Sequence, residues 1–197
     1  MAKLKFYYGS MNCGKSTLLL QRIHNRESRN MKIALFKPSI DTKGERSVVS
    51  RLGISREVDE LLLPSISLYR LVKDEYLDCS TIFIDEAQFM EPDQVEDALK
   101  VSSILDIPIE CYGLRTDFLT NSFPGSKRLL EIADEINEIE TRCECGRKAT
   151  LVARYKDGIM VLDGDQVAID NNNSIKYISY CPKCYFEESE KYKIKKY

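Results

Sequence analysis

The chain has 197 residues, enough for one sizeable hydrophobic core or for a core with a small satellite domain. Its 29 Lys and Arg residues nearly balance its 31 Asp and Glu residues, which argues against a nucleic-acid-binding protein because such proteins carry a basic excess. The apolar runs are too short to cross a bilayer, so we expect no membrane partner. No secretion leader is visible at the N-terminal residues, and we therefore expect a cytoplasmic protein.

Residues 1–140 alternate short apolar runs with longer amphipathic stretches, a pattern typical of βαβ units and of the α/β class. The apolar runs predict strands at Lys3–Tyr8, Lys32–Lys37, Thr81–Asp85 and Pro108–Tyr112. The amphipathic stretches predict helices at Ser16–Glu27, Pro92–Leu105 and Ser126–Ile136. Because the strands are mostly apolar, we expect them to be buried on both faces of a mostly parallel sheet. Asp41–Leu62 shows no clear periodicity and is the best candidate for a mobile loop.

A phosphate-binding loop directly follows the first predicted strand. Its residues fit the pattern G-x-x-x-x-G-K-[ST] and lead directly into a predicted helix, which is the context the motif requires. Glycines let backbone N–H groups surround a phosphate, Lys15 adds a charge toward the β and γ phosphates, and Ser16 can place its hydroxyl on Mg²⁺. A chance match in a glycine turn is the less favoured alternative. We predict that ATP, with Mg²⁺, contacts Gly9, Ser10, Met11, Asn12, Cys13, Gly14, Lys15 and Ser16.

Two carboxylates stand at the end of the strand predicted at Thr81–Asp85. Asp85 and Glu86 follow Thr81–Ile84 in the Walker B arrangement, in which the aspartate holds Mg²⁺, usually through water. Glu86 is placed to act as general base for the hydroxyl that attacks the γ phosphate. That hydroxyl belongs to water in an ATPase and to the substrate in a kinase, and the strand alone does not decide between them.

Four of the seven cysteines form two close pairs separated by about 35 residues. Cys143 and Cys145 make the first pair, and Cys181 and Cys184 make the second. Two thiolate pairs joined by a loop predict a tetrahedral site with four protein ligands, which suits a structural Zn²⁺. A pair of disulfides is the alternative, disfavoured in a reducing compartment.

The sequence changes in character after Arg142, where the paired cysteines begin. Two short strand-like runs, Ala149–Tyr155 and Ser174–Tyr180, belong to this region, and alternating charges and tyrosines over Glu187–Tyr197 indicate a solvated tail. We therefore predict a P-loop nucleotide-binding domain over residues 1–140, a zinc-binding domain over 141–190 and a C-terminal tail over 191–197.

The order and spacing of several blocks identify a family resemblance. Over nearly its whole length the chain resembles the type II thymidine kinases, the cellular and bacterial group. The blocks that carry the resemblance are Tyr8–Ser16, Phe36–Pro38 with Asp41 and Thr42, Val49–Gly53, Asp85–Phe89, Tyr112–Phe118 and Cys143–Ala149.

This resemblance implies a RecA-like P-loop core and a zinc-anchored "lasso" loop that closes over the nucleoside. It implies that Glu86 takes the proton from the 5′-hydroxyl of thymidine, that Asp85 and Gln88 belong to the nucleotide site, and that the protein is a homotetramer. By motif position, the residues expected to contact the nucleoside are Met11, Phe89, Leu114, Phe118, Phe123 and Tyr177.

In one segment the chain departs from the family pattern. Where the family usually has an Ile-Gly-Gly turn in the lasso, this chain has Ile169–Asn173 and is about two residues longer before Tyr177. Asp and Asn tolerate left-handed backbone better than most residues, so such a turn can still form. The altered turn bears on which backbone atoms meet the base.

Two alternatives to thymidine phosphorylation stay open at this point. The first is a zinc-ribbon P-loop ATPase that acts on nucleic acid, because P-loop cores and zinc ribbons also occur together there. The second keeps the kinase but extends the acceptor to deoxyuridine or other deoxynucleosides, since the thymine methyl group contributes only about 1–3 kcal/mol of discrimination.

Overall fold

A six-stranded sheet forms the centre of the molecule in a computed structural model that describes residues 1–39, 46–167 and 174–193. Its strands are β1 (Leu4–Tyr8), β2 (Ile33–Pro38), β5 (Glu60–Leu62), β6 (Thr81–Ile84), β7 (Ile109–Gly113) and β8 (Glu135–Glu138). They lie in the order β5-β2-β6-β7-β1-β8, and every neighbouring pair is parallel. The predicted α/β class and parallel sheet are confirmed, and each predicted strand is found within two residues of its expected ends.

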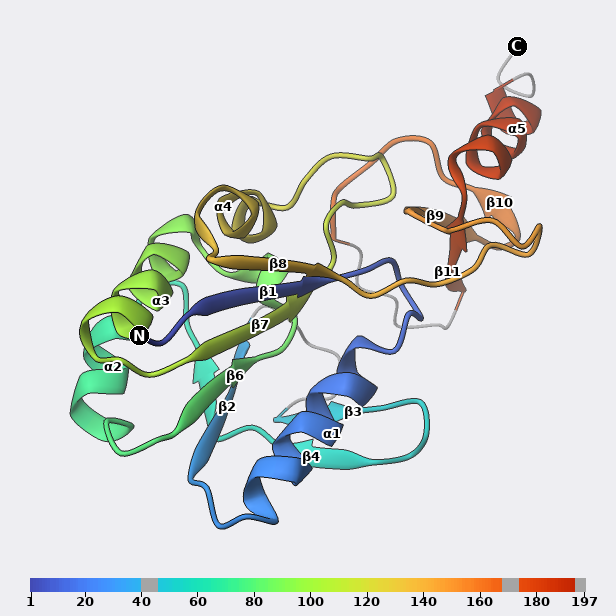
Figure 1. The fold of residues 1–197 in the computed structure, drawn as a ribbon. Coiled ribbons are helices and arrows are strands. Elements are labelled where there is room, and N and C mark those ends of the chain that lie inside the picture. The colour runs from blue at the N-terminus through green and yellow to red at the C-terminus, as the bar shows by residue number, and fades with distance from the viewer. Residues whose placement is uncertain (40–45, 168–173, 194–197) are drawn as a thin grey trace.

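Helices cover both faces of this sheet (Figure 1). Helix α1 (Lys15–Glu27) lies on one face, and α2 (Leu68–Glu75), α3 (Pro92–Ile104) and α4 (Pro124–Ile132) lie on the other. Alternate strand residues supply the two cores: Leu35 packs with α1, whereas Ala34 and Phe36 pack with α2 and α3. Parallel strands with crossover helices point their carboxyl ends to the same edge, and the loops at that edge form the candidate site.

A buried carboxylate fastens α1 to the sheet. Glu110 of β7 is only 2% exposed and accepts hydrogen bonds from the guanidinium groups of Arg22 and Arg26 at 3.0 and 2.8 Å. The hydroxyl of Tyr112 donates a further bond to it at 2.8 Å. Because a buried charge is stable only when it is paired and hydrogen-bonded, this cluster fixes how α1 lies against β7.

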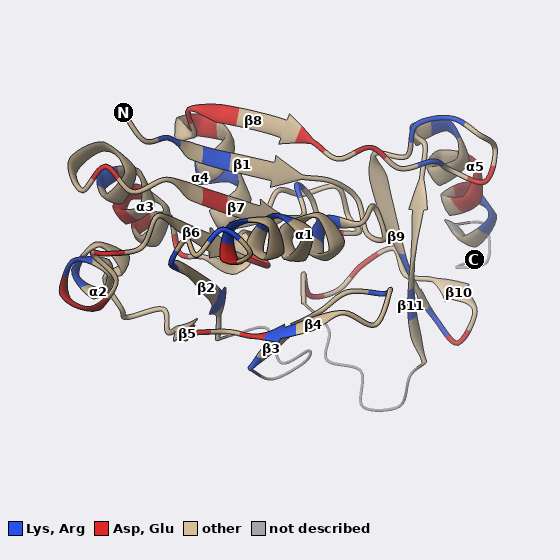
Figure 2. Cartoon of the chain, turned by 60° about the horizontal axis from the view of Figure 1, so that its bottom comes forward, with Lys and Arg blue, Asp and Glu red and all other residues tan. Residues whose placement is uncertain are grey.

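A second, smaller sheet lies beyond the carboxyl edge of the first. Strands β9 (Leu151–Lys156), β10 (Ile159–Met160) and β11 (Ile175–Tyr180) pair antiparallel in the order β10-β9-β11. Helix α5 (Pro182–Lys193) packs on this sheet through Tyr185, against Tyr155 and Met160. In Figure 2 both α2 and α5 carry acidic and basic residues, consistent with the near-neutral composition.

The helix predicted at Ser126–Ile136 is wrong at both ends. Helix α4 begins at Pro124, whose missing N–H suits the first helical position, and Phe123 precedes it as the N-cap. It ends at Ile132, and Ile136 belongs to β8 instead. Pairing with the backbone of β1 therefore outweighs the helical pattern of this stretch.

The loop predicted at Asp41–Leu62 contains regular structure. Strands β3 (Ser47–Val49) and β4 (Ser55–Glu57) form a hairpin, and β5 joins the main sheet. The hairpin forms because Ser50 N–H donates to the carbonyl of Ile54 at 2.8 Å and because Val48 is buried against the α1 core. Residues 40–45, which include Asp41 and Thr42 of the family resemblance, lie outside the described residues.

The solvated tail predicted at Glu187–Tyr197 is also wrong for most of its length. Helix α5 continues to Lys193 because one of its faces, including Ser189, is buried. It runs across the expected boundary between residues 190 and 191, while residues 194–197 lie outside the described part. The altered lasso turn, Ile169–Asn173, lies outside it as well. In the described residues no helix is long and apolar enough to cross a membrane.

Candidate active site

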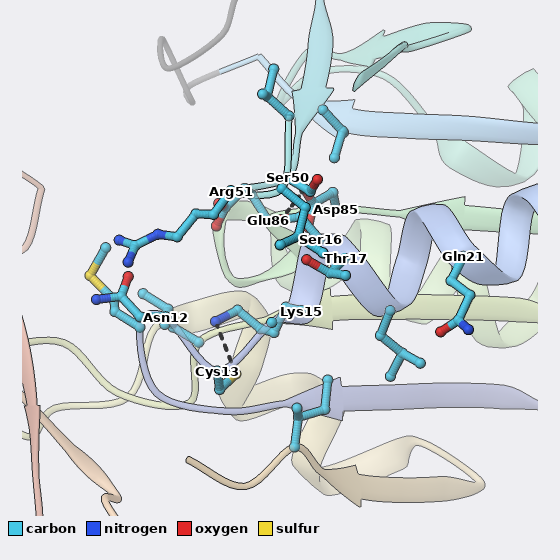
Figure 3. Close-up of a pocket in the computed structure, with 18 of the residues that line it drawn as sticks. Asn12, Cys13, Lys15, Ser16, Thr17, Gln21, Ser50, Arg51, Asp85 and Glu86 are labelled. Atoms are coloured by element: carbon cyan, nitrogen blue, oxygen red, sulfur yellow. Dashed lines mark hydrogen bonds between the residues drawn. The ribbon is translucent and has the colours of Figure 1, made fainter. Parts of the chain in front are cut away.

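A cavity of about 760 Å³ opens where β1, β2, β6 and β7 end (Figure 3). The phosphate loop forms one wall, and the β3–β4 hairpin forms the facing wall. Figure 3 shows Ser16, Asp85 and Glu86 together at its centre, with Lys15 directed toward Cys13. The residues that sequence analysis assigned to the nucleotide and that line this cavity are Met11, Asn12, Cys13, Gly14, Lys15, Ser16 and Asp85.

The phosphate loop has the backbone that an anion site requires. Gly14 stands at the N-cap of α1 with φ of 86°, a conformation that favours glycine, and no side chain caps the helix. The first turn of α1 lines the cavity and contains no acidic residue, so none of its side chains neutralises the positive end of the helix dipole there. Gly9 is required for space, because a Cβ there would lie 2.6 Å from the carbonyl oxygen of Ile139. The loop therefore has the backbone geometry that phosphate-binding loops use.

Lys15 and Ser16 supply the polar side chains of the loop. The Lys15 ammonium donates to the carbonyls of Ser10 at 3.0 Å and Gly9 at 3.4 Å, which holds it within the loop. The Ser16 hydroxyl donates to Asp85 Oδ2 at 3.3 Å. A serine hydroxyl beside an aspartate at the end of a strand is the donor set that P-loop proteins offer to the Mg²⁺ of a nucleotide, and the residues here fit that ion.

Burial dominates the electrostatics of Asp85. Its side chain is 4% exposed, and loss of solvent, followed by the charge of Glu86, raises its pKa to about 7. Lys15 and Lys37 act in the opposite direction and lower this pKa. A cation bound at Asp85 would favour the ionised carboxylate in the same way.

Glu86 is held in place by backbone and side-chain constraints. It adopts a left-handed conformation with φ of 50° at the start of a short helical turn, Ala87–Phe89, and such strain in a residue other than glycine is frequent at functional sites. Its Oε2 accepts a hydrogen bond of 2.5 Å from Nε2 of Gln88, and the Leu114 N–H donates to Oε1 of Gln88 at 3.0 Å. Gln88 thus links the candidate base to the loop after β7.

Of the residues predicted to contact the nucleoside, Met11 and Leu114 line the cavity. Phe89 and Phe123 pack edge to face with ring centroids 5.5 Å apart, so they form one aromatic unit beside Gln88. Phe118 is buried beneath Arg154, whose guanidinium carbon lies 3.7 Å from the ring centroid. Gln88, assigned to the nucleotide from sequence, is 1% exposed and bonds to Glu86 and Leu114. Direct substrate contact by these residues stays a prediction.

Two contributors to the cavity lie in blocks that carry the family resemblance, but sequence analysis assigned neither of them to the site. Lys37, the next-to-last residue of β2, lies near Asp85, is 2% exposed and lines the cavity. A lysine at the end of an otherwise apolar strand was the available signal. The hairpin residues Ser47–Leu52 form the facing wall, and Arg51 extends from it across the cavity in Figure 3. Nothing in the local pattern indicates that this segment folds back over the loop, because the contact is made in tertiary structure.

The four paired cysteines come together as one cluster. Their sulfur atoms all lie within 4.8 Å of one another, and the Cys145 and Cys181 sulfurs are 3.6 Å apart. A tetrahedral zinc with thiolate ligands needs sulfur separations of about 3.8 Å, so the four residues fit this metal. The N–H of Cys184 lowers the pKa of Cys181 to about 7, whereas the neighbouring sulfurs raise the pKa of Cys184 to about 12. Four thiolates this close therefore need a cation to balance their charge.

Comparison with known proteins decides the family. The family model described as thymidine kinase matches residues 2–185. The chain belongs to the thymidine kinase family. Among its relatives in this family, the thymidine kinase of Ruegeria pomeroyi is 43% identical over 187 residues, covering 93% of each chain. That of Yersinia pestis is 44% identical over 191 residues, covering 95% of this chain and 96% of the other.

A third family member, the thymidine kinase of Rhodopirellula baltica, is 44% identical over 195 residues, covering 96% of this chain and 90% of the other. Among solved structures, the Pif1 helicase from Candida albicans aligns with 70% of this chain and 36% of its own, at a TM-score of 0.42 and 16% identity. A similarity that low carries no weight for the fold or the function of this family member.

Proposed function

We propose that this protein is an ATP-dependent thymidine kinase, which transfers the γ phosphate of ATP to the 5′-hydroxyl of thymidine and releases ADP and thymidine monophosphate. The observation that carries the proposal is a family match over residues 2–185 in a chain whose phosphate loop and Glu86 face the same cavity. A hydrolase would need only the loop and a water molecule. A thymidine kinase would also bind a nucleoside there, and the family match therefore supports phosphate transfer rather than hydrolysis.

The chemistry follows from the residues around this cavity. Glu86 would accept the proton of the 5′-hydroxyl as the hydroxyl oxygen of thymidine bonds to the γ phosphorus. At the same time the bond from the γ phosphorus to the oxygen that bridges the β and γ phosphates would break, which releases ADP. Lys15 and the N–H groups of the loop would stabilise the charge that spreads over the phosphate oxygens. Asp85 and Ser16 would hold Mg²⁺, which supplies charge neutralisation when it is bound with ATP. Gln88 would keep the Glu86 carboxylate directed at the acceptor.

We further propose that the cysteine cluster binds structural Zn²⁺ and that residues 141–190 act as a zinc-anchored lasso domain beside a P-loop domain at 1–140. The four-sulfur geometry supports the first part. The separate antiparallel sheet and its own hydrophobic cluster support the second. A cytoplasmic homotetramer is the assembly we propose from the family resemblance, and light scattering on purified protein tests its size.

An acceptor panel tests the proposed reaction. Purified, zinc-loaded protein is given ATP labelled in the γ phosphate with thymidine, deoxyuridine, deoxycytidine or single-stranded DNA. We expect labelled thymidine, with kcat/KM for deoxyuridine lower by roughly 10–200-fold because it lacks the thymine methyl group. Hydrolysis of ATP stimulated by single-stranded DNA, with no nucleoside labelled, would contradict the proposal and support a nucleic-acid-dependent ATPase.

A further inference from the structure

Arg154 of β9 is a buried cation that joins three separate segments. It is 4% exposed. Its two terminal nitrogens donate to the carbonyls of Asp165 and Gln166, each at 2.8 Å, and its Nε donates to the hydroxyl of Tyr177 at 3.1 Å. One planar group therefore connects the segment after β10 with strand β11.

The flat face of the same guanidinium reaches the loop after β7. Its central carbon lies 3.7 Å from the ring centroid of Phe118, a close stacking contact. Two hydrogen bonds tie this loop to the segment after β10 and to helix α5. Gln166 Nε2 donates to Asp117 Oδ2 at 2.9 Å, and the Tyr185 hydroxyl donates to the Phe118 carbonyl at 2.7 Å. Phe118 and Tyr177, both expected to contact the nucleoside, are thus held by one side chain.

The partners of Arg154 show that its charge is not used for an ion pair in the described residues. They are two backbone carbonyls, a hydroxyl and an aromatic ring, all of them neutral. Burying a cation among neutral groups is costly, and a well-packed apolar side chain often stabilises a core better. What an arginine adds is geometry, because its rigid fork binds two successive carbonyls while its face stacks on a ring.

We infer that Arg154 is a positioning residue for the nucleoside side of the active site. It sets the distance between Phe118 and Tyr177 by fixing both to the backbone of residues 165–166, and it acts through them rather than on the reacting atoms. This inference rests on the proposed function, since it takes Phe118 and Tyr177 to contact the nucleoside. The phosphate loop is not among the partners of Arg154, so nucleotide binding should not depend on it.

Arg154→Lys tests the inference, because lysine keeps the charge and the stem but cannot bridge two carbonyls and stack. We expect KM for thymidine to rise by about tenfold or more, the loss that a charge-assisted bidentate contact implies, with KM for ATP within about twofold. Zinc content and the thermal midpoint are measured on the same preparation. Arg128→Lys, on α4 with surface ion pairs to Glu96 and Glu131, is the matched control and should leave both KM values unchanged.

Arg154→Gln is measured in parallel. Glutamine is neutral, so this variant leaves no buried charge without its hydrogen-bond partners. The same division between the two KM values is expected. The inference is overturned by an unchanged KM for thymidine in either folded, zinc-loaded variant. A parallel rise in KM for thymidine and for ATP also overturns it, and so does failure of both variants to fold. Either outcome would show that Arg154 contributes to general stability and not to the position of the nucleoside. Absence of thymidine phosphorylation by the wild-type protein would instead refute the proposed function, so the two failures are distinguishable.

Discussion

Asp85 and Glu86 are neighbours in the chain, yet their surroundings give them different tasks. Asp85 is almost fully buried and accepts a hydrogen bond from Ser16, whereas Glu86 is half-buried and is held by Gln88. A carboxyl whose pKa is raised to about 7 releases its proton readily when a cation approaches. The first residue is thus suited to a metal, and the second to a proton from the substrate.

The raised pKa of Asp85 predicts a pH-dependent cost in stability. Its pKa rises from the ordinary 3.8 to about 7 on folding, so the folded state holds a proton that the unfolded state has lost between these values. Stability contributed by this group is therefore present below about pH 4 and is lost as pH rises through 7, a change of roughly 4 kcal/mol at most. Asp85→Asn, which never ionises, escapes this loss.

Thermal unfolding without nucleotide and with EDTA measures the effect. Asp85→Asn should exceed the wild-type midpoint by an amount that grows from about pH 5 to about pH 8. The matched control is Asp78→Asn, whose carboxylate is exposed and paired with Lys32 on the surface. A difference between Asp85→Asn and wild type that stays constant over this range, or shrinks as pH rises, would contradict the account.

At the scale of elements, the ends of the strands determine the site. Gly113 closes β7 in a position where only glycine fits, because a Cβ would lie 2.7 Å from Oε1 of Gln88 and 3.0 Å from its backbone nitrogen. The Gln88 amide is the group that orients Glu86. Close approach of β7 to the turn at Ala87–Phe89 therefore sets the position of the candidate base.

We expect Gly113→Ala to lower kcat by at least about tenfold, because the added methyl group displaces the Gln88 amide from Glu86. A double-mutant cycle with Gln88→Leu separates this route from a general loss of stability. If the methyl group acts through Gln88, kcat of the double variant should be little lower than kcat of either single variant. Fully additive losses in kcat would show that the two changes act independently.

Much of the fold could be predicted from the sequence because its strongest signals are local. Strands β1, β2, β6 and β7 are apolar runs, and the helix pattern of α1 and α3 is regular, so all were found within a residue at each end. Strand β8 was missed because Ile136 lies in a stretch with helical periodicity, and only pairing with β1 makes it a strand. The hairpin at Ser47–Glu57 was missed because its stability depends on packing against α1.

For the candidate site, too, the residues that were predicted are those in local sequence motifs. The phosphate loop and the carboxylates at Asp85 and Glu86 lie in continuous motifs, so residue type and spacing located them. Lys37 was given no role because it reaches the cavity only through the order of strands in the main sheet. The hairpin wall was given none because it is a separate two-stranded sheet that reaches the cavity by packing against α1. Contacts between residues distant in sequence are invisible to a pattern that extends over a few positions.

On the scale of the whole molecule, the small sheet and the phosphate loop are in direct contact. The Ser179 hydroxyl of β11 donates to the carbonyl of Met11 at 2.6 Å, and Ser10 Oγ donates to the Ala149 carbonyl at 3.5 Å. Strand β11 ends at Tyr180, and Cys181, one of the four clustered cysteines, follows it directly. The cysteine cluster therefore supports the strand that touches the loop.

Removal of zinc should weaken both substrate sites. We expect chelation to raise KM for ATP and for thymidine, because the anchor of β11 is lost, and to make residues 141–190 sensitive to protease. Zinc content, both KM values and the cleavage pattern are measured before and after the metal is restored. Cys79→Ser is a control outside the cluster. Full activity of a protein shown to be free of zinc would refute the structural role of the metal.

The central claim is that Glu86 takes the proton from thymidine while the phosphate loop holds ATP. Transfer of labelled γ phosphate from Mg-ATP to thymidine, measured for wild type and for Glu86→Gln, tests it most directly. We expect kcat to fall by about 10²–10⁴-fold with ATP binding unchanged, the loss typical of a missing general base. Exposed Glu57→Gln on β4 should retain wild-type kcat. Turnover of thymidine by Glu86→Gln within a few-fold of wild type would contradict the claim.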